Sequence, residues 1–436
     1  MSKFRLACLL LAGGISAAMS CEAADLDIRG SDTVGAQLAP ALVRAWLQEQ
    51  GYRQLDEKGA DEAREITGRS AAGKSLTVAL EAKGSSTGFA ALQAKATDIA
   101  MASRPIKAEE VTALKDLGQC DSAACEYVLG LDGIAVIVNP KNPVSNLNTA
   151  TLQRIFSGQI KDWKQAGGAA GAIHVVALDE NSGTFDTFSH LVMHGTPLAA
   201  GARRDASHAA IASMVAADAN AIGFVGLPFV GGTKAVAVNE EGTTPITPSA
   251  FSVATEDYAL SRRLYFYLPE RSADELARKF VDFAVSDAGQ QVAAESGFVS
   301  QQVTAVDEVV PATAPEEYRQ LTAGAQRLSL NFRFMKGMAN LDTKSQRDVE
   351  RLKRYMNRPE NKARQLMLFG FADSNESLPI VSLQLSTDRA DTVADLLAAH
   401  GIAATKTRGY GNEVSVASNA TEAGRYKNRR VEVWVR

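Results

Sequence analysis

Gly84-Ser85-Ser86-Thr87-Gly88 separates the apolar segment 76–80 from the helix-like segment 89–94. This order predicts a strand, a loop of hydroxyl side chains bounded by glycines, and a helix. The first N–H groups of a helix have no intrahelical partner, so such a loop can hold an anion. For one loop on its own, a helix cap with turn glycines is the alternative interpretation.

The chain repeats this arrangement twice more. Gly30-Ser31-Asp32-Thr33 and Asn181-Ser182-Gly183-Thr184 each follow an apolar run and precede a helical pattern. The three loops together predict one anion held between them.

Length and charge indicate more than one module. A chain of 436 residues is long enough for two or three domains, and its net charge of −4 favours no binding to nucleic acid. Residues 311–436 contain 20 Lys and Arg against 14 Asp and Glu, a charge of +6, so residues 1–310 carry −10. Two differently charged modules are therefore expected.

The first 23 residues have the pattern of a secretory signal. Lys3 and Arg5 precede an apolar run over residues 6–18, and small residues follow. Cleavage after a small-x-small motif is expected, with a lipid anchor at Cys21 as the alternative. After residue 25 no apolar run is long enough to cross a bilayer.

Cys120 and Cys125 are the cysteine pair of the folded part, and in an exported chain they predict a disulfide. Metal binding is the other interpretation, but no histidine lies near them in the sequence. We therefore expect neither a metal nor a cofactor.

Residues 25–300 alternate short apolar strands with amphipathic helices, which predicts an α/β fold. Strands are expected at 98–102, 134–138, 174–178 and 222–225, and a helix over 38–47 that stops near Gly51. The charged stretch 53–73 is interpreted as a solvated insertion or mobile loop.

Several motifs resemble, in order, the substrate-binding proteins of phosphate ABC transporters. They are Gly30–Thr33, Gly84–Gly88, Asp98–Pro105, Leu131–Pro140, Ile155–Trp163, Ser182–Thr184 and Ala221–Phe224. The resemblance implies a two-lobed α/β periplasmic binding protein of type II over residues 24–303, with a second lobe at about 134–225. Its expected ligand is phosphate or a similar oxyanion, and its expected partner is an ABC transporter permease.

The resemblance also implies a ligand-binding set. It consists of Ser31, Thr33, Val34, Ser85, Ser86, Arg104, Ser182, Gly183 and Thr184. Arg104 departs from an aspartate of the family that accepts the phosphate proton, and Leu178 stands where many relatives carry arginine. Arg104 is therefore expected to supply the positive charge, with Asp32 or Glu180 as proton acceptor. The alternative is that Arg104 pairs with the nearby Glu109 or Glu110.

The segment 304–325 contains Pro311 and Pro315 and is interpreted as a linker. Residues 328–334 then alternate apolar and polar side chains, which predicts a half-buried strand. Further strands are expected at 365–371 and 431–435, and a helix is expected to begin at a capping Ser386 and to end at Gly401.

Residues 326–436 resemble the OmpA-like peptidoglycan-binding domain, an α+β unit of βαβαβ type. The resemblance lies in Leu385–Ala390, Gly409-Tyr410-Gly411 and Asn428–Glu432. It implies that Asp373 and Arg389 bind the diaminopimelate of the peptidoglycan stem peptide.

The binding loop departs from the family pattern. Phe371 and Ser382 stand where histidine and asparagine are usual. In the alternative interpretation, Asp373 and Arg389 only pair with each other.

An enzyme is the rival class of protein. A phosphoester hydrolase needs a nucleophile with a base or a metal cluster, and the residue spacing predicts no catalytic residues. The basic run 425–430 is interpreted as a solvated face. The expected function is oxyanion binding by a receptor tethered to peptidoglycan in the periplasm, and the alternative is an envelope tether protein whose ligand lobe has changed or lost its ligand.

Overall fold

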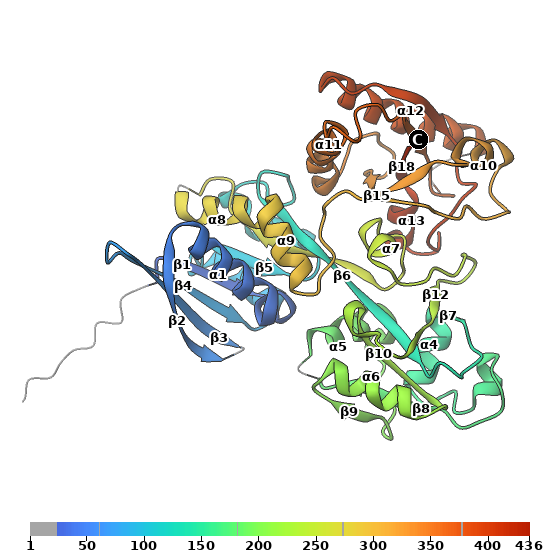
Figure 1. The fold of residues 1–436 in the computed structure, drawn as a ribbon, viewed down its shortest axis with the longest axis horizontal. Helices are drawn as coiled ribbons and strands as arrows, with labels where there is room; N and C mark the ends of the chain where they lie inside the picture. The colour runs from blue at the N-terminus through green and yellow to red at the C-terminus, as the bar shows by residue number, and fades with distance from the viewer. Residues whose placement is uncertain (1–23, 61, 181, 273, 376–377) are drawn as a thin grey trace, which may run out of the picture.

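The computed structural model describes residues 24–436 except 61, 181, 273, 376 and 377 (Figure 1). The predicted signal peptide, Cys21 and Asn181 therefore lie outside the described residues. Within the described part of the chain, no helix is both long enough and apolar enough to cross a membrane.

The first lobe is a mixed sheet with helices on both faces. Its strand order is β2 (Tyr52–Ala60), β3 (Ala63–Ser70), β4 (Ser75–Ala82), β1 (Leu26–Gly30), β5 (Ile99–Ala102), β13 (Ser261–Tyr267) and β6 (Glu126–Val138). The helices are α1 (Ala39–Glu49), α2 (Ser85–Gln93), α3 (Ala108–Ala113), α8 (Glu275–Val285) and α9 (Asp287–Glu295). Trp46 of α1 packs edge-on against Phe280 of α8, and Phe89 of α2 against Tyr267 of β13.

Strand β6 connects the two lobes. Its residues 126–133 pair with β13, and its residues 134–138 pair with β10 (Ala221–Gly226) in the second lobe. Further strands there are β7 (Asn146–Asn148), β8 (His174–Leu178), β9 (Arg203–Asp205), β11 (Lys234–Ala235) and β12 (Ala237–Asn239). The helices are α4 (Thr149–Phe156), α5 (Gly183–Phe188), α6 (His208–Ala217) and α7 (Ala250–Ala254). The second core also contains Val236, Val238 and Tyr258, so the packing extends beyond the predicted segment 134–225.

The C-terminal domain is one sheet with helices. Its strand order is β14 (Ala305–Val306), β15 (Gln326–Arg333), β18 (Arg430–Val435), β16 (Leu366–Gly370) and β17 (Ala404–Gly409). The helices are α10 (Glu316–Thr322), α11 (Thr343–Met356), α12 (Pro379–Ala399) and α13 (Glu422–Asn428). Helix α12 begins at Pro379, so Ser386 lies inside the helix and does not cap it as predicted. Its hydroxyl instead accepts a hydrogen bond from the Gly411 amide.

Most of the stretch 53–73 forms the antiparallel hairpin β2–β3 at the edge of the first sheet, so the predicted mobile loop is wrong, whereas most of the side chains of β2 are exposed to solvent as the other interpretation predicted. Backbone pairing to β4 holds the hairpin, which leaves its charged side chains in solvent. Glu57 on β2 forms ion pairs with Arg44 and Arg64. Charged residues suit such an edge because they discourage pairing with other chains.

The predicted linker 304–325 is packed against the C-terminal sheet. Strand β14 pairs with β15, and Tyr318 of α10 lies edge-on against Phe369, Phe371 and Trp434. Burial of the Tyr318 ring against these aromatic side chains stabilises the packed position of the segment, so it does not behave as a flexible linker.

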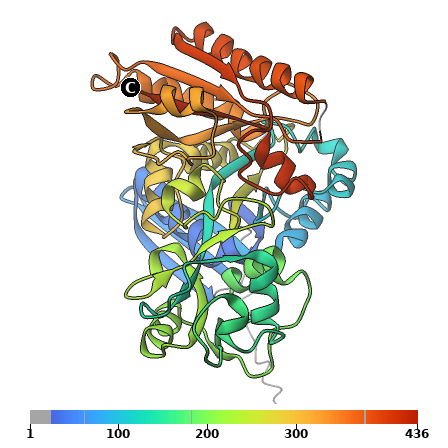
Figure 2. The same ribbon diagram turned by 90° about the vertical axis from the view of Figure 1, so that its right-hand side faces the viewer.

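Strand β15 is buried on both faces, although the alternating pattern predicted a half-buried strand. Its polar residues Arg327, Asn331 and Arg333 all contact Asp257, which follows α7 of the binding part. Figures 1 and 2 show the C-terminal domain next to the strands that connect the two lobes. The polar face of this strand is therefore a contact between domains.

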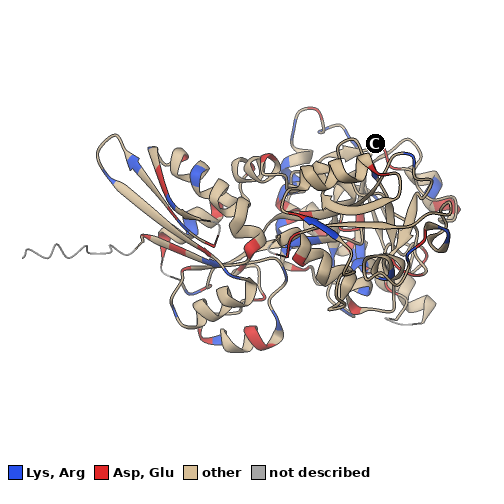
Figure 3. Cartoon of the chain, turned by 90° about the horizontal axis from the view of Figure 1, so that it is seen from below, with Lys and Arg blue, Asp and Glu red and all other residues tan. Residues whose placement is uncertain are grey.

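The basic run 425–430 is also buried in part and is not the predicted solvated face. The Lys427 ammonium donates to the Tyr258 carbonyl at 3.0 Å, and the Arg430 side chain is fully buried beside Glu432. Figure 3 shows Lys and Arg interspersed with Asp and Glu along the ribbon.

Cys120 and Cys125 are buried free thiols, so the structure does not contain the predicted disulfide. The two thiols interact directly, and this contact lowers the pKa of Cys120. The same contact, together with burial, raises the pKa of Cys125. Apolar neighbours from α2 and β13 enclose the pair and shield it from solvent.

Candidate functional site

A cavity of about 500 Å³ lies where the two lobes meet. We call it the anion cavity. Its walls carry hydroxyl groups and both signs of charge, from Ser31, Asp32, Thr33, Lys83, Gly84, Ser85, Ser86, Thr87, Ser103, Arg104, Lys107, Asp186, His190 and Arg262. Ser31, Thr33, Ser85, Ser86 and Arg104 of the predicted set therefore come together.

Close packing of α2 on β1 brings the first two loops to this cavity. A side chain at Gly88 would place its Cβ 2.5 Å from the Arg29 carbonyl, so only glycine permits this approach. The Ser85 hydroxyl accepts a hydrogen bond from the Ser103 amide at 3.1 Å, which connects α2 to the end of β5. The free N–H groups of the first turn of α2 then lie beside the hydroxyl groups.

Arg262 is the cation at the centre of the site, although it is not among the residues predicted from the sequence. Its guanidinium donates to the Thr33 hydroxyl at 2.7 Å and to the Gly183 carbonyl at 2.8 Å, which joins the first and third loops. Asp132 and Asp186 lie 3.3 and 3.7 Å away. Burial lowers the pKa of Arg262, which these carboxylates oppose. An arginine within the mostly apolar strand β13 was the available signal in the sequence.

Arg104 lies at the rim of the cavity. It pairs with Glu110 at 2.7 Å, as the alternative interpretation predicted, and also donates to the Ser86 hydroxyl at 2.9 Å. The hydrogen bond to Glu110 raises the pKa of Arg104. Ser86 is the middle residue of a Gly-x-Ser-x-Gly run, but an arginine is its partner here, which suits binding better than nucleophilic attack.

Of the two predicted proton acceptors, only Asp32 lines the cavity. Burial raises its pKa, with Asp186 and Glu62 adding to the effect, and hydrogen bonds from backbone amides oppose it. Glu180 is three-quarters exposed and pairs with Arg204. A carboxyl group whose proton affinity is raised can accept a hydrogen bond from a protonated oxyanion.

The third loop begins α5. The Ser182 hydroxyl caps this helix by accepting from the Phe185 amide, and Gly183 meets the site through its carbonyl group. Ser182, Gly183, Thr184 and Val34 of the predicted set do not line the anion cavity, and Val34 lies in the core. Leu178 is fully buried, and the positive charge between the lobes comes from Arg262 on a different strand.

In the C-terminal domain, Asp373 and Arg389 are both almost fully buried. Asp373 accepts a hydrogen bond from Arg429 at 2.9 Å, and Arg389 donates to the Phe371 carbonyl at 3.4 Å. Phe371 stands where the resemblance predicted a histidine, and its ring packs against the Arg430 guanidinium. The two predicted residues therefore belong to one buried polar region.

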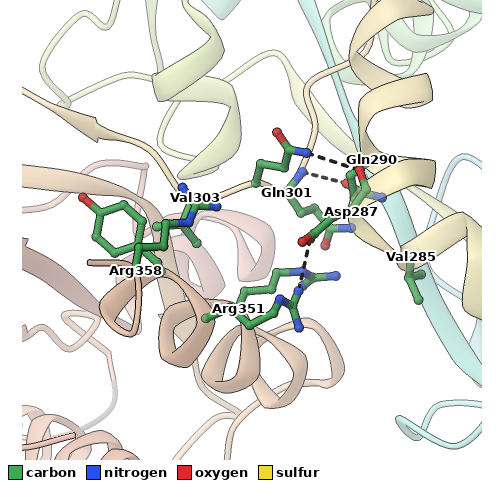
Figure 4. Close-up of a pocket in the computed structure, with 10 residues that line it drawn as sticks. Val285, Asp287, Gln290, Gln301, Val303, Arg351 and Arg358 are labelled. Atoms are coloured by element: carbon green, nitrogen blue, oxygen red, sulfur yellow. Dashed lines mark hydrogen bonds and ion pairs between the residues drawn. The ribbon is translucent and has the colours of Figure 1, made fainter. Parts of the chain in front are cut away.

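The contact between the domains joins both lobes to the C-terminal domain. Arg263 of β13 bonds Glu256 and Asp342, the residue that caps α11. On the first lobe, Arg354 lies 3.6 Å from Asp287, and on the second the Ser418 amide donates to Glu240. Figure 4 shows Asp287 pointing toward the arginines of α11 beside a small pocket. Among the described residues, no group of three or more metal-binding side chains is present.

Comparisons with known proteins divide the chain in the same way. A model of the PBP superfamily domain matches residues 62–288, and a model of the OmpA family matches residues 333–429. The phosphate-binding protein PstS of Staphylococcus haemolyticus is 30% identical over 243 residues, which cover 53% of this chain and 75% of that protein. The corresponding protein of Staphylococcus aureus is 31% identical over 226 residues, covering 50% and 67%.

The fold of the binding part is shared with a solved structure. A possible phosphate binding protein from Planctomyces limnophilus superposes with a TM-score of 0.51 at 22% identity, covering 63% of this chain and 92% of that one. This likeness supports the two-lobed fold.

Proposed function

We propose that this chain, which belongs to the PBP superfamily and carries a C-terminal OmpA family domain, binds phosphate or a related tetrahedral oxyanion between its lobes. One observation carries the proposal. A nearly buried guanidinium, that of Arg262, and the hydroxyl groups of the first two loops converge on one cavity. The names of the relatives supply the ligand class.

The proposed chemistry is binding without catalysis. Hydroxyl groups and helix N–H groups donate to the oxyanion, and the guanidinium balances its charge. A hydrogen bond to a charged group contributes about 1.5–3 kcal/mol, so Thr33→Ala should weaken binding roughly tenfold to a hundredfold.

Titration calorimetry of the mature full-length chain with phosphate and with sulfate tests this proposal. We expect phosphate to bind and Thr33→Ala to weaken it. Binding of sulfate with none of phosphate would contradict the phosphate assignment. Binding of neither would favour the tether protein whose ligand lobe has lost its ligand.

We further propose that the C-terminal domain holds the receptor to peptidoglycan in the periplasm, where an ABC transporter permease can receive the ligand. The diaminopimelate end is a zwitterion, so each half needs a partner of opposite charge, and Asp373 and Arg389 supply the two signs. Because both are buried, we expect the side chains that cover them to rearrange when the peptide binds.

A pull-down of the full chain on purified peptidoglycan sacculi tests the second proposal. Asp373→Asn and Arg389→Gln should each reduce binding, whereas Asp391→Asn on the exposed face of α12 should not. Circular dichroism controls for folding. If the folded variant with both substitutions still binds the sacculi, another surface of the protein binds peptidoglycan.

A further inference from the structure

A second cavity, of about 680 Å³, adjoins the anion cavity. We call it the tail cavity. The two cavities share Ser103, Arg104, His190 and Arg262 as lining residues, so a ligand at the arginines faces both. Pockets for small organic ligands have volumes of about 300–1,000 Å³, whereas an inorganic oxyanion needs only a fraction of that space.

We propose that the ligand is a phosphomonoester of a small alcohol, with its phosphate group in the anion cavity and its organic group in the tail cavity. This inference rests on the proposed function and names the ligand class of the same site. A monoester keeps three oxygens for the hydroxyl and guanidinium donors. Its fourth oxygen carries the organic group and needs an exit from the anion cavity, which the shared lining residues provide.

The lining of the tail cavity suits an organic group. Apolar side chains from both parts of the chain line it, among them Ile106, Leu191, Tyr265, Met335 and Leu341. The amides of Gln119 and Gln346 lie among them and can bond a hydroxyl group of the ligand. Apolar side chains beside hydrogen-bonding groups are usual in a site for a small organic molecule, and the polar and charged residues of this cavity suit an organic group that carries hydroxyl groups.

The charged residues that line the tail cavity determine which end of the ligand lies at the anion cavity. Arg104 and Arg262 belong to the part shared with the anion cavity. At the other end Glu256 and Asp342 are both bonded to Arg263, and Glu126 accepts from the Tyr267 hydroxyl at 2.8 Å. These carboxylates would disfavour a second anionic group, so the organic part is expected to be neutral or cationic.

The C-terminal domain forms one wall of the tail cavity. Met335, Leu341 and Gln346 come from this domain, as do Asp342, Thr343 and Tyr426. Fusion of the two domains therefore gives the site a wall that the binding part does not possess by itself.

Calorimetry of the full-length chain with glycerol 3-phosphate and with inorganic phosphate tests the inference. We expect the Kd of the ester to be no more than about threefold higher than the Kd of phosphate. Gln346→Trp on α11 places a large ring in the tail cavity and should weaken the ester roughly tenfold or more while phosphate changes less than about twofold. Glu350→Trp, one turn further along the same helix and outside the cavity lining, is the matched control.

Ala123→Trp fills the cavity from the first lobe and gives a second variant if Gln346→Trp does not fold. Binding of phosphate with ester binding weaker by more than about threefold would overturn the inference and leave the proposed function intact. An ester that binds tightly and is insensitive to both tryptophans would also overturn it. If neither the ester nor phosphate binds, the proposed function itself is contradicted.

Discussion

At the scale of single residues, two consecutive arginines of β13 serve different parts of the molecule. Side chains alternate across a strand, so Arg262 faces the cleft between the lobes while Arg263 faces the C-terminal domain. The contact that closes the binding site and the contact that holds the C-terminal domain are therefore one residue apart.

Arg262→Gln should weaken phosphate binding more than Arg104→Gln does. Arg262 is nearly buried, whereas Arg104 is already paired with Glu110 at the rim. Loss of a charge-assisted hydrogen bond costs about 1.5–3 kcal/mol, so Arg262→Gln should cost roughly a hundredfold in affinity and Arg104→Gln roughly tenfold. Calorimetry measures the phosphate affinity of both variants. A larger loss for Arg104→Gln than for Arg262→Gln would show that Arg104 supplies the main positive charge.

Asp32→Asn should reduce the preference for phosphate over sulfate. A carboxylate accepts the proton of hydrogen phosphate but repels sulfate, which has no proton to donate at neutral pH. Burial already raises the pKa of Asp32, so a charge is costly there. Competition between the two anions measures the preference, and an unchanged ratio would exclude Asp32 as the acceptor.

At the scale of elements, the start of α5 and the loop after β1 meet directly. A Cβ atom at Gly183 would lie 2.4 Å from the Thr33 hydroxyl oxygen and 2.9 Å from the Thr33 Cα. The backbone of Thr33 cannot yield as a flexible side chain could, so the first helical turn must carry glycine for the lobes to approach this closely.

Gly183→Ala should therefore hinder closure of the lobes and weaken ligand binding by roughly tenfold. The second lobe should still fold, because alanine is acceptable at a helix start. Gly201→Ala is the control, since nothing lies within 4 Å of a Cβ at that position. Calorimetry and thermal unfolding separate the two effects. Unchanged affinity would mean that the lobes bind ligand without this contact.

At the scale of the whole molecule, the two modules meet through opposite charges. Asp257 and Glu256 of the binding part face Arg327 and Arg333 of the C-terminal domain. Because the C-terminal domain contacts both lobes, any opening of the cleft must rearrange some of these bonds.

Asp342→Asn should destabilise the contact between the domains. Asparagine still caps α11, but the charge opposite Arg263 is lost. Removal of one partner from a buried pair costs about 3 kcal/mol. Denaturant unfolding measures the loss of stability, with Asp388→Asn at an exposed position of α12 as the control. A loss no larger than the control's would show that Glu256 alone suffices for Arg263.

The same pair predicts an acid dependence. Burial tends to raise the pKa of Asp342, but Arg263 and the cap hydrogen bonds outweigh it and lower the pKa to about 2. Because the pKa of Asp342 is lower in the folded chain than in the unfolded chain, its ionised form stabilises the fold at pH values above about 4, the pKa in the unfolded chain. This stabilisation is lost as the pH falls from about 4 to about 2. Stability measured across this range should fall more steeply in the natural chain than in Asp342→Asn. Parallel curves would contradict the assignment.

The sequence by itself determined the loops, most strands and the division into two charged modules. Local patterns suffice for these, because hydrophobic periodicity, turn residues and net charge can all be read from neighbouring positions in the chain. Strand β8 was predicted over residues 174–178 and lies there, and the buried stripe of α1 was predicted from its spacing.

The tertiary structure alone decided which groups meet. Arg262 and Thr33 lie 229 positions apart and become neighbours only because β13 pairs between β5 and β6. The polar face of β15 and the run 425–430 resemble solvated surfaces in the sequence, yet they are buried because a second domain of opposite charge covers them. No local pattern contains the position of that second domain, since its packing depends on contacts between distant segments.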